Sequence, residues 1–373
     1  MRSDARPWTD GVLDTRSLIA AAAGLPEQLA AAAGAVSLRS AQPVGHDPDA
    51  LVVVGIGPDA APGEMLAAAG VSELTVPVVV TSGPRLPGFV TRQTLVIALA
   101  GAAAAPETVA AARDALGRGA SLVAIAPPGD LAELASANEA TVHLLVDGAG
   151  GRTALGSVLG ALLATCETWG LWHGATGAAR CAAGALAARR DALLAPDGGI
   201  ARSVARRIGG TFASVHGAAG VGAVAARRWA DQIAMSAKAP AFAGEEPGRS
   251  VAAVAGFGQH GDVTRQVFTL VELRTDGEGE IAAARFAAVQ ELAREAVAGI
   301  VEVQAVGPDP LAQLLDLVLV GDFAAIQLAA AVGLDPGPVP AVDEVSRAVA
   351  SGRPRDADPT NESTRSRLAT GGP

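Results

Sequence analysis

The chain has 373 residues, a formal net charge of −10 and only 3% aromatic residues, with no tyrosine. This length predicts two domains of ordinary size, each able to bury its own core. The acidic balance and the absence of a basic block argue against a nucleic-acid-binding surface.

The cysteines and the apolar segments predict an ordinary cytoplasmic protein. Cys166 and Cys181, the only cysteines, fit neither a metal-ligand spacing nor a disulfide framework. The N-terminus has no apolar segment of the signal-peptide type. Asp316 and Asp322 interrupt the longest apolar stretch, residues 314–333, so we expect no membrane span and no membrane partner.

The first half of the chain predicts strands and helices in short alternation. Residues 50–57, "ALVVVGIG", form a continuous apolar run ended by glycines, which is typical of a parallel strand buried on both faces. The alternation predicts a parallel sheet covered by helices on both sides. The full set is a helical hairpin or broken helix at 17–36, strands at 50–57, 74–83, 93–101, 120–129 and 140–148, and helices at 106–119 and 130–139.

The second half repeats the α/β pattern after a long helical region, so the chain reads as two α/β halves of comparable size. The tail from residue 351 is rich in proline, glycine and charge, and we expect it to be disordered. The predicted elements are helices at 153–194, 221–240 and 284–299, strands at 211–220 (with its loop), 249–258, 265–276 and 300–307, and one long or two broken helices at 310–333.

Residues 55–60, "GIGPDA", follow a predicted strand and match the looser dinucleotide fingerprint G-x-G-x-x-A. Asp59 and Pro62 interrupt the helix start that should present free N–H groups to a pyrophosphate. No acidic residue ends the next strand to hold a ribose. Dinucleotide binding is therefore an alternative, not the first interpretation.

The histidines form no H-x-x-H or H-x-x-x-H pair, which argues against a zinc site. His216 is predicted in a Gly-rich loop after a strand, where it is the histidine best placed to meet a ligand. A loop histidine bonded to the backbone is the alternative. Glu245 and Glu246 are predicted in a solvated turn, and neither a G-x-S-x-G motif nor a P-loop is present.

The order of several short motifs carries more information than any one of them. They are "LPEQL" (25–29), "VVVGIGPDAAPGEML" (52–66), "LVIALAGAAAAPETV" (95–109), "GGRTALG" (150–156), "ARRWADQIAMSAKAPAF" (226–242) and "GDFAAIQLAAAVGLDPGPV" (321–339). With these motifs, residues 18–350 resemble the bacterial and archaeal bifunctional phosphoglucose/phosphomannose isomerases of the sugar isomerase (SIS) superfamily.

The resemblance implies two SIS domains, each a flavodoxin-like α/β/α sandwich with a parallel sheet, in a homodimer. The second would be of the phosphoglucose/phosphomannose isomerase C-terminal type. The boundaries that it predicts are an N-terminal segment at 1–17, a first SIS domain at 18–152, connecting helices at 153–194, a second SIS domain at 195–350 and a disordered tail at 351–373.

The resemblance also implies a reaction, the isomerisation of glucose 6-phosphate or mannose 6-phosphate to fructose 6-phosphate, without metal or cofactor. In the family a glutamate moves a proton between C1 and C2, a histidine assists ring opening and an arginine stabilises the enediolate. Serine and threonine hydroxyls, with backbone N–H groups at helix starts, hold the phosphate. The expected partner is therefore a sugar phosphate.

The two implied phosphate loops have lost their hydroxyls. The first keeps Gly57 but has Asp59 in place of the family's serine, and a carboxylate near a phosphate dianion is repulsive. In the second loop the family's three hydroxyl residues are replaced by alanine, and only the helix start is kept. These positions are Ala100, Ala102 and Ala105, followed by the retained Glu107 and Thr108.

The catalytic positions implied by the resemblance are also substituted. The register places Met235 on the glutamate, Val251 on the histidine and Ser346 on a C-terminal lysine, whereas Arg152 is the retained enediolate-stabilising arginine. A thioether cannot accept a proton from carbon, and losing a general base or acid costs a rate factor of ~10²–10⁴ each.

Three hypotheses follow. The first is a catalytically degenerate SIS protein with a binding, regulatory or structural role in sugar-phosphate or mannose metabolism. The second is an active isomerase that uses relocated residues such as His216, Glu107 or Glu64. The third is a dinucleotide-binding protein.

Overall fold

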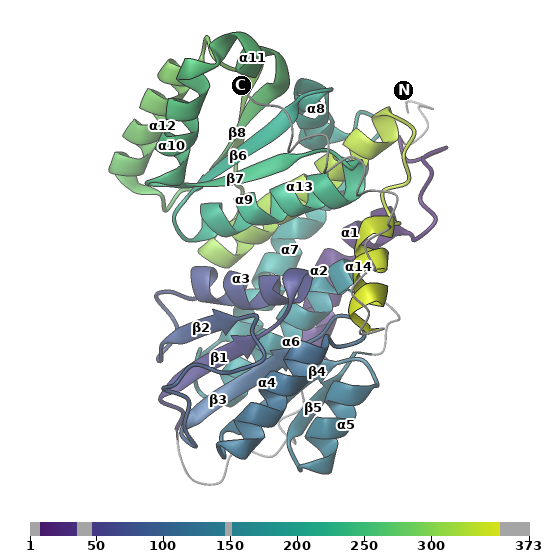
Figure 1. Ribbon diagram of the computed structural model, residues 1–373, viewed down its shortest axis with the longest axis vertical. Coiled ribbons are helices and arrows are strands. Elements are labelled where there is room, and N and C mark those ends of the chain that lie inside the picture. The colour runs from purple at the N-terminus through teal and green to yellow at the C-terminus, as the bar shows by residue number, and fades with distance from the viewer. Residues whose placement is uncertain (1–7, 36–46, 146–150, 351–373) are drawn as a thin grey trace, which may run out of the picture.

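The computed structural model describes residues 8–35, 47–145 and 151–350. It contains two parallel β-sheets with helices on both sides of each (Figure 1). The predicted α/β class with parallel sheets is therefore confirmed. The domain boundaries remain a prediction, and the tail expected to be disordered lies outside the described residues.

The first sheet has the strand order β2-β1-β3-β4-β5, with every pairing parallel. This is the flavodoxin-like order, in which the chain reverses its direction of growth between the first and third strands. All residues of β1 and β3 are buried, as the continuous apolar runs predict. The strands are β1 (Ala50–Val54), β2 (Val78–Thr81), β3 (Thr94–Leu99), β4 (Ser121–Ala126) and β5 (Thr141–Leu144).

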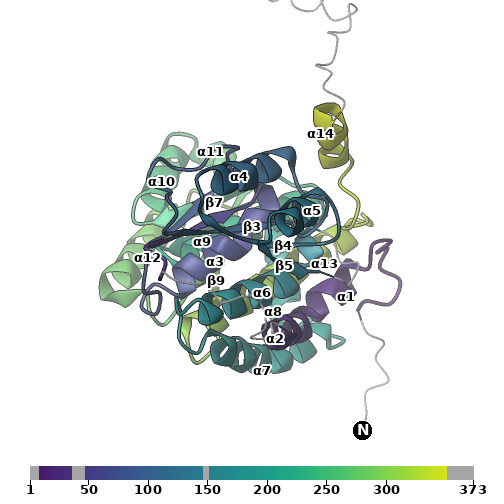
Figure 2. The same ribbon diagram turned by 90° about the horizontal axis from the view of Figure 1, so that it is seen from below.

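Helices α4 and α5 cover one face of this sheet, and α3 and α6 cover the other. Helices α2, α6 and α7 pack side by side and lie in the lower part of Figure 2. The helical elements are α1 (Leu18–Ala23), α2 (Leu25–Ala35), η1 (Gly57–Ala60), α3 (Ala61–Ala69), α4 (Pro106–Gly117), α5 (Asp130–Ala137), η2 (Gly151–Thr153), α6 (Leu155–Thr168) and α7 (Ala175–Leu194).

The second sheet has the order β7-β6-β8-β9 and is also parallel throughout. Its strands are β6 (Phe212–Ala218), β7 (Ala241–Glu246), β8 (Phe268–Arg274) and β9 (Gly299–Gln304). Its helical elements are α8 (Gly199–Ile208), α9 (Val221–Gln232), the π-helix η3 (Ile233–Ala237), α10 (Arg249–Gln259), α11 (Gly261–Val267), α12 (Gly279–Ala293), α13 (Pro310–Ala331) and α14 (Pro340–Ala350).

The strand predicted at 249–258 is wrong, because this segment forms helix α10. Val254 and Phe257 are its buried residues, and their spacing of three is helical rather than alternating. The strand of this region is instead β7, which no predicted element covered. Glu245 and Glu246 therefore lie in a strand and not in a solvated turn, and Glu246 is buried.

Helix α13 occupies the centre of the molecule. It packs on α7, α8, α9 and η3, and it also contacts α1 and α3 of the first half. In the described part of the chain it is the one helix long and apolar enough to cross a membrane, yet 83% of its apolar window is buried inside the protein. Its hydropathy is thus that of a core helix that helices of both halves cover.

The closest packing on α13 involves Gly321 and predicts an effect on stability. A Cβ at this position would overlap the indole of Trp229, whose Nε1 donates to the Leu317 carbonyl oxygen at 2.7 Å. We expect Gly321→Ala to lower the free energy of unfolding by about 1–3 kcal/mol, measured by urea denaturation. In the control Gly184→Ala, at an exposed position of α7 with nothing near the added Cβ, stability should rise slightly. Equal effects of the two changes would contradict this account.

Candidate functional site

The first sheet has its topological switch point between β1 and β3, and ligands of open parallel sheets bind outside the carboxyl ends of strands at such points. The loops after these two strands, residues 55–60 and 100–105, are the two loops identified from the sequence. Gly55 makes the first turn possible, because a Cβ there would overlap the Asp59 carbonyl oxygen. Gly57 follows with a φ of +57°, a conformation that favours glycine.

Asp59 joins the two loops. Its Oδ1 accepts a hydrogen bond from the backbone N–H of Gly101 at 2.9 Å. Burial raises the pKa of this carboxyl, and the Gly101 hydrogen bond partly offsets that rise. The carboxylate of the first loop is thus the hydrogen-bond acceptor for a backbone N–H of the second loop.

The second loop offers backbone groups and few functional side chains. The Ala100 side chain is fully buried, and Ala105 caps α4 without a side-chain hydrogen bond. Ala102 and Glu107 are half-buried, and Thr108 is 1% exposed. The start of α4 could hold an anion through its N–H groups, but no hydroxyl of the loop residues 100–105 assists it.

A small pocket of about 100 Å³ lies between the first loop and helix α9. Gly57, Pro58 and Met235 all line it, so the structure brings the first loop together with the residue that the resemblance predicts at the family's glutamate position. Met235 is half-buried within η3, and such π-helical turns occur often at functional sites. The carboxylates among the lining residues are Glu64 and Asp231.

Arg152 lies near this pocket and is held from several sides. Its guanidinium donates to Ser236 Oγ at 3.0 Å, and to the carbonyl oxygens of Pro336 and Gly337 at 2.5 and 2.8 Å. A weaker contact of 3.5 Å reaches Gln232 Oε1. Arg152 therefore connects the segment after α13, at Pro336 and Gly337, to η3 through hydrogen bonds.

The sequence reasoning missed Arg227, which links the two halves. Its Nε lies 3.1 Å from Glu64 Oε2 on α3, and its Nη1 lies 3.9 Å from Glu245 Oε2 on β7. One helical turn later, Asp231 lines the same pocket, and burial raises its pKa. The i,i+4 spacing of Arg227 and Asp231 on a predicted helix is the signal that could have identified this face.

Three of the residues singled out from the sequence lie elsewhere. Val251 is on α10 and 53% exposed, and Ser346 is exposed on α14, which stands away from the main body in Figure 2. His216 was expected in a loop, and this was wrong. It lies inside β6 and is 1% exposed, because the strand continues through the glycine that follows it.

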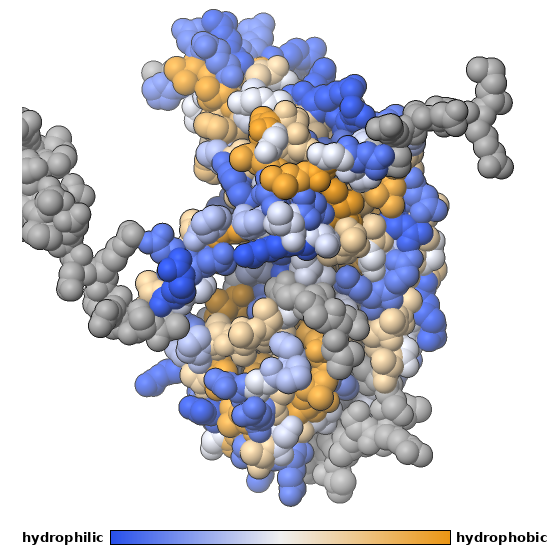
Figure 3. Space-filling model, turned by 90° about the vertical axis from the view of Figure 1, so that its right-hand side faces the viewer, coloured by the Kyte–Doolittle hydropathy of each residue, from blue (hydrophilic) through white to orange (hydrophobic). Residues whose placement is uncertain are grey.

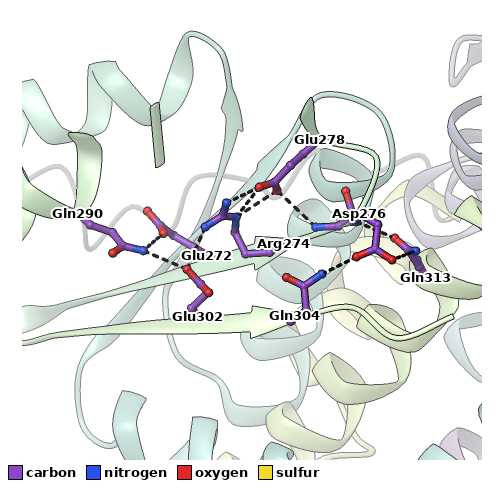
Figure 4. Close-up of polar contacts among 9 residues, drawn as sticks. Glu272, Arg274, Asp276, Glu278, Gln290, Glu302, Gln304 and Gln313 are labelled. Carbon is purple, nitrogen blue, oxygen red and sulfur yellow. Dashed lines mark hydrogen bonds and ion pairs between the residues drawn. The ribbon is translucent and has the colours of Figure 1, made fainter. Parts of the chain in front are cut away.

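At the carboxyl ends of β8 and β9 in the second sheet, polar side chains bind one another. Arg274 at the end of β8 binds both carboxylate oxygens of Glu278 and reaches Glu302 at 2.9 Å (Figure 4). Beside it, Asp276 accepts from Gln304 at 3.1 Å and from Gln313 at 2.8 Å. These pairs satisfy one another and leave the carboxyl edge of this sheet without a free cation in the drawn network.

Beneath α10 and α12, the outer face of the second sheet buries ionisable groups. His216 pairs with Glu272 in register, and Glu246 lies on the neighbouring strand. His216 Nδ1, Glu246 Oε1 and Glu272 Oε1 are the buried side-chain atoms without a hydrogen bond in the described residues. Burial lowers the pKa of His216 to about 4 and raises that of Glu272 to about 7. In the described residues no group of three or more His, Cys, Asp or Glu side chains is arranged to hold a metal.

Comparison with known proteins shows which proteins this chain is similar to. Residues 199–348 match the bacterial phospho-glucose isomerase C-terminal SIS domain. The chain is 26% identical over 322 residues to a bifunctional phosphoglucose/phosphomannose isomerase of Caldicellulosiruptor bescii, covering 86% of this chain and 95% of that protein.

Solved structures show the same fold. A hypothetical protein of Thermus thermophilus superposes with a TM-score of 0.69 at 16% identity, covering 91% of each chain. The tagatose-6-phosphate ketose/aldose isomerase of Escherichia coli superposes with a TM-score of 0.64 at 14% identity, covering 87% of this chain and 96% of that one. The strand order 2-1-3-4-5 of the first sheet also differs from the usual dinucleotide-binding order 3-2-1-4-5-6 and gives that alternative no support.

The buried Glu272 predicts a pH-dependent stability. Its pKa rises from 4.5 to about 7 through burial and the nearby Glu302 and Glu278 carboxylates, against the Gln290 hydrogen bond and Arg274. Between these two values the unfolded chain releases a proton that the folded chain keeps, so this group lowers stability as the pH rises from about 4.5 to 7. Glu272→Gln should raise the melting temperature at pH 8 and leave it nearly unchanged at pH 4, as measured by calorimetry.

The matched control is Glu280→Gln, at an exposed position of α12. It should change the melting temperature little at either pH. A gain from Glu272→Gln that is equally large at pH 4 and pH 8 would contradict the proposed protonation of Glu272.

Proposed function

Because this chain has the SIS fold and is related to the bifunctional phosphoglucose/phosphomannose isomerases, we propose that it is a catalytically inactive relative of those enzymes. It has a binding, regulatory or structural role in sugar-phosphate or mannose metabolism, in the cytoplasm and as a homodimer. Its ligand, where one binds, is a sugar phosphate of the kind that the related isomerases take.

The observation that carries this proposal is the hydrogen bond from Gly101 N–H to the Asp59 carboxylate. A phosphate at this switch point would use the same backbone donor and would face the carboxylate. Two unit charges of like sign at 4 Å repel by about 4 kcal/mol at an effective dielectric constant of 20. The Asp59 carboxylate therefore takes a hydrogen-bond donor that a bound phosphate would use. The alanines of the second loop supply no hydroxyl to compensate for this donor.

The side chains around the adjoining pocket support the same conclusion. Proton transfer between C1 and C2 needs a base within hydrogen-bond reach of a carbon-bound proton. Met235, at the family's glutamate position, lines the pocket with a thioether that cannot serve. Arg152 is engaged by two carbonyl oxygens and Ser236, so stabilising an enediolate would require it to release these acceptors.

A second candidate function, an isomerase with a relocated base, is favoured by one observation. Asp231 lines the pocket, makes no ion pair within 4 Å in the described residues, and has a pKa raised by burial. A carboxylate whose pKa is raised is a stronger base than an ordinary aspartate. Glu64, the other lining carboxylate, is paired with Arg227 and is a weaker candidate.

The test is conversion of glucose 6-phosphate and mannose 6-phosphate by the purified protein, with sugar-phosphate binding measured by calorimetry. We expect no turnover above the buffer control and weak binding. Asp59→Ser frees the Gly101 N–H and restores a hydroxyl, so it should tighten sugar-phosphate binding by at least fivefold. The control Asp49→Ser removes an exposed carboxylate just before β1, at the opposite edge of the same sheet, and should change nothing.

Two outcomes would reject the proposal. Turnover by the wild-type protein that disappears in Asp231→Asn would establish the second candidate function. Tight binding of a sugar phosphate that is unchanged in Asp59→Ser would show that the carboxylate does not occupy the phosphate position.

A further inference from the structure

A large hollow lies far from both switch points, beside the carboxyl end of α13. It has a volume of about 680 Å³ and is bounded by residues 8–13, helix α8 and the last turns of α13. Among its lining residues, Leu13, Val332 and Leu334 are exposed hydrophobic side chains, with exposed fractions of 55%, 67% and 38%. Trp8 closes one side, held by a hydrogen bond of 2.8 Å from its Nε1 to the Leu193 carbonyl oxygen.

A smaller and more polar hollow of about 340 Å³ adjoins it on α8. Arg202 and Arg206, one helical turn apart, line both hollows, and Arg207 and Ser203 line only the smaller one. The arginine pair thus stands at the boundary between an apolar chamber and a polar one. On the face that carries both ends of the described chain, hydrophobic and strongly hydrophilic surfaces lie directly beside one another (Figure 3).

The positive charge of this region is not neutralised by the protein. Arg206 and Arg207 make no ion pair in the described residues, and Arg202 donates only to the Pro196 carbonyl oxygen, at 3.2 Å. Asp10 lines the larger hollow and Asp197 the smaller one, so the two hollows together have three arginines and two carboxylates. Asp197 also accepts a hydrogen bond from the Gly199 N–H at 3.1 Å. In a chain of net charge −10, three neighbouring arginines without a carboxylate partner among the described residues form a local site for an anion.

We propose that the two hollows form one binding site for a small amphiphilic anion. Its apolar body lies in the larger hollow against Trp8, Leu13 and Leu334, and its phosphate or carboxylate lies in the smaller hollow at Arg202 and Arg206. The guanidinium groups bind such oxyanions through paired N–H donors, and the apolar wall gains from removing hydrocarbon from water.

Size and charge favour a free small molecule over a membrane or a protein segment. A volume of 680 Å³ lies within the 300–1,000 Å³ typical of small-molecule pockets. Attraction to an anionic membrane surface usually takes a cluster of 4–8 Lys or Arg side chains, more than this region has. The site does not depend on the proposed function, because it shares no residue with the pocket at Met235.

The test is isothermal titration of the full chain with decyl phosphate below its micelle concentration. We expect one molecule to bind per chain, and the double variant Arg202→Gln/Arg206→Gln to weaken binding at least tenfold. The matched control Arg92→Gln/Arg113→Gln removes two exposed arginines from the first half and should leave binding unchanged. Leu334→Asp should weaken decyl phosphate binding and leave the melting temperature within a few degrees of wild type, since this side chain is partly exposed.

Titrations with other ligands distinguish the two-part site from its alternatives. Inorganic phosphate should bind at least tenfold more weakly than decyl phosphate, and so should decanol, because each lacks one half of the ligand. Equal binding of either compound overturns the two-part site, as does the absence of decyl phosphate binding. Association with vesicles of phosphatidylserine and phosphatidylcholine that is stronger than decyl phosphate binding, and that the arginine variant abolishes, would instead assign the surface to a membrane.

Discussion

Helix α13 has to be buried, and this requirement shapes both halves of the molecule. It is 22 residues long and apolar on nearly all sides, so helices α7, α8 and α9 must surround it. The few polar groups on it are paired rather than exposed. Asp322 binds Arg228 of α9 at 2.7 Å, and Asp316 binds Arg189 of α7 at 2.6 Å. Such buried charges are costly without a partner, so they fix how the helices meet.

The central packing also determines where chemistry can take place. Because α13 and α9 lie between the sheets, the carboxyl edge of β1 and β3 faces α9 and its π-helical extension across a small pocket. In an open parallel sheet this edge is the place for a ligand. Here Asp59 spans the two loops of that edge through Gly101, while Arg227 spans the two halves through Glu64 and Glu245. The polar groups of the cleft are largely engaged with each other.

The second half shows the same principle at the carboxyl ends of β8 and β9. Arg274, Glu278 and Glu302 form one set of contacts and Asp276, Gln304 and Gln313 another (Figure 4). Below them, His216, Glu246 and Glu272 each have a buried atom without a hydrogen bond, although Glu246 Oε1 lies 3.5 Å from Arg285 Nε. Unsatisfied ionisable groups respond by shifting their pKa, and the opposite shifts of His216 and Glu272 both favour the neutral forms. On α8, by contrast, Arg206 and Arg207 make no ion pair with the described residues.

Much of the fold was predictable, and particular residues show why some of it was not. The strands at 50–57 and 93–101 were found because a parallel strand buried on both faces is apolar at every position. The segment 249–258 was misassigned because a run rich in valine and alanine is compatible with a strand, whereas Val254 and Phe257 are buried at helical spacing in α10. Glycines after His216 suggested a loop, yet this residue lies in β6, and the missing Cβ of Gly244 on the neighbouring β7 leaves room for its ring.

By itself, the sequence determined the α/β class and the parallel sheets, and it identified the two loops at the candidate site; through the resemblance it also predicted Met235 at the family's glutamate position. These features depend on local periodicity and on residue type, which a chain displays in order. Only the tertiary structure decided that Asp59 accepts the Gly101 N–H, that Arg152 is engaged by the segment after α13, and that Val251 and Ser346 lie away from the pocket. Each of these depends on which distant segments become neighbours when α13 is buried.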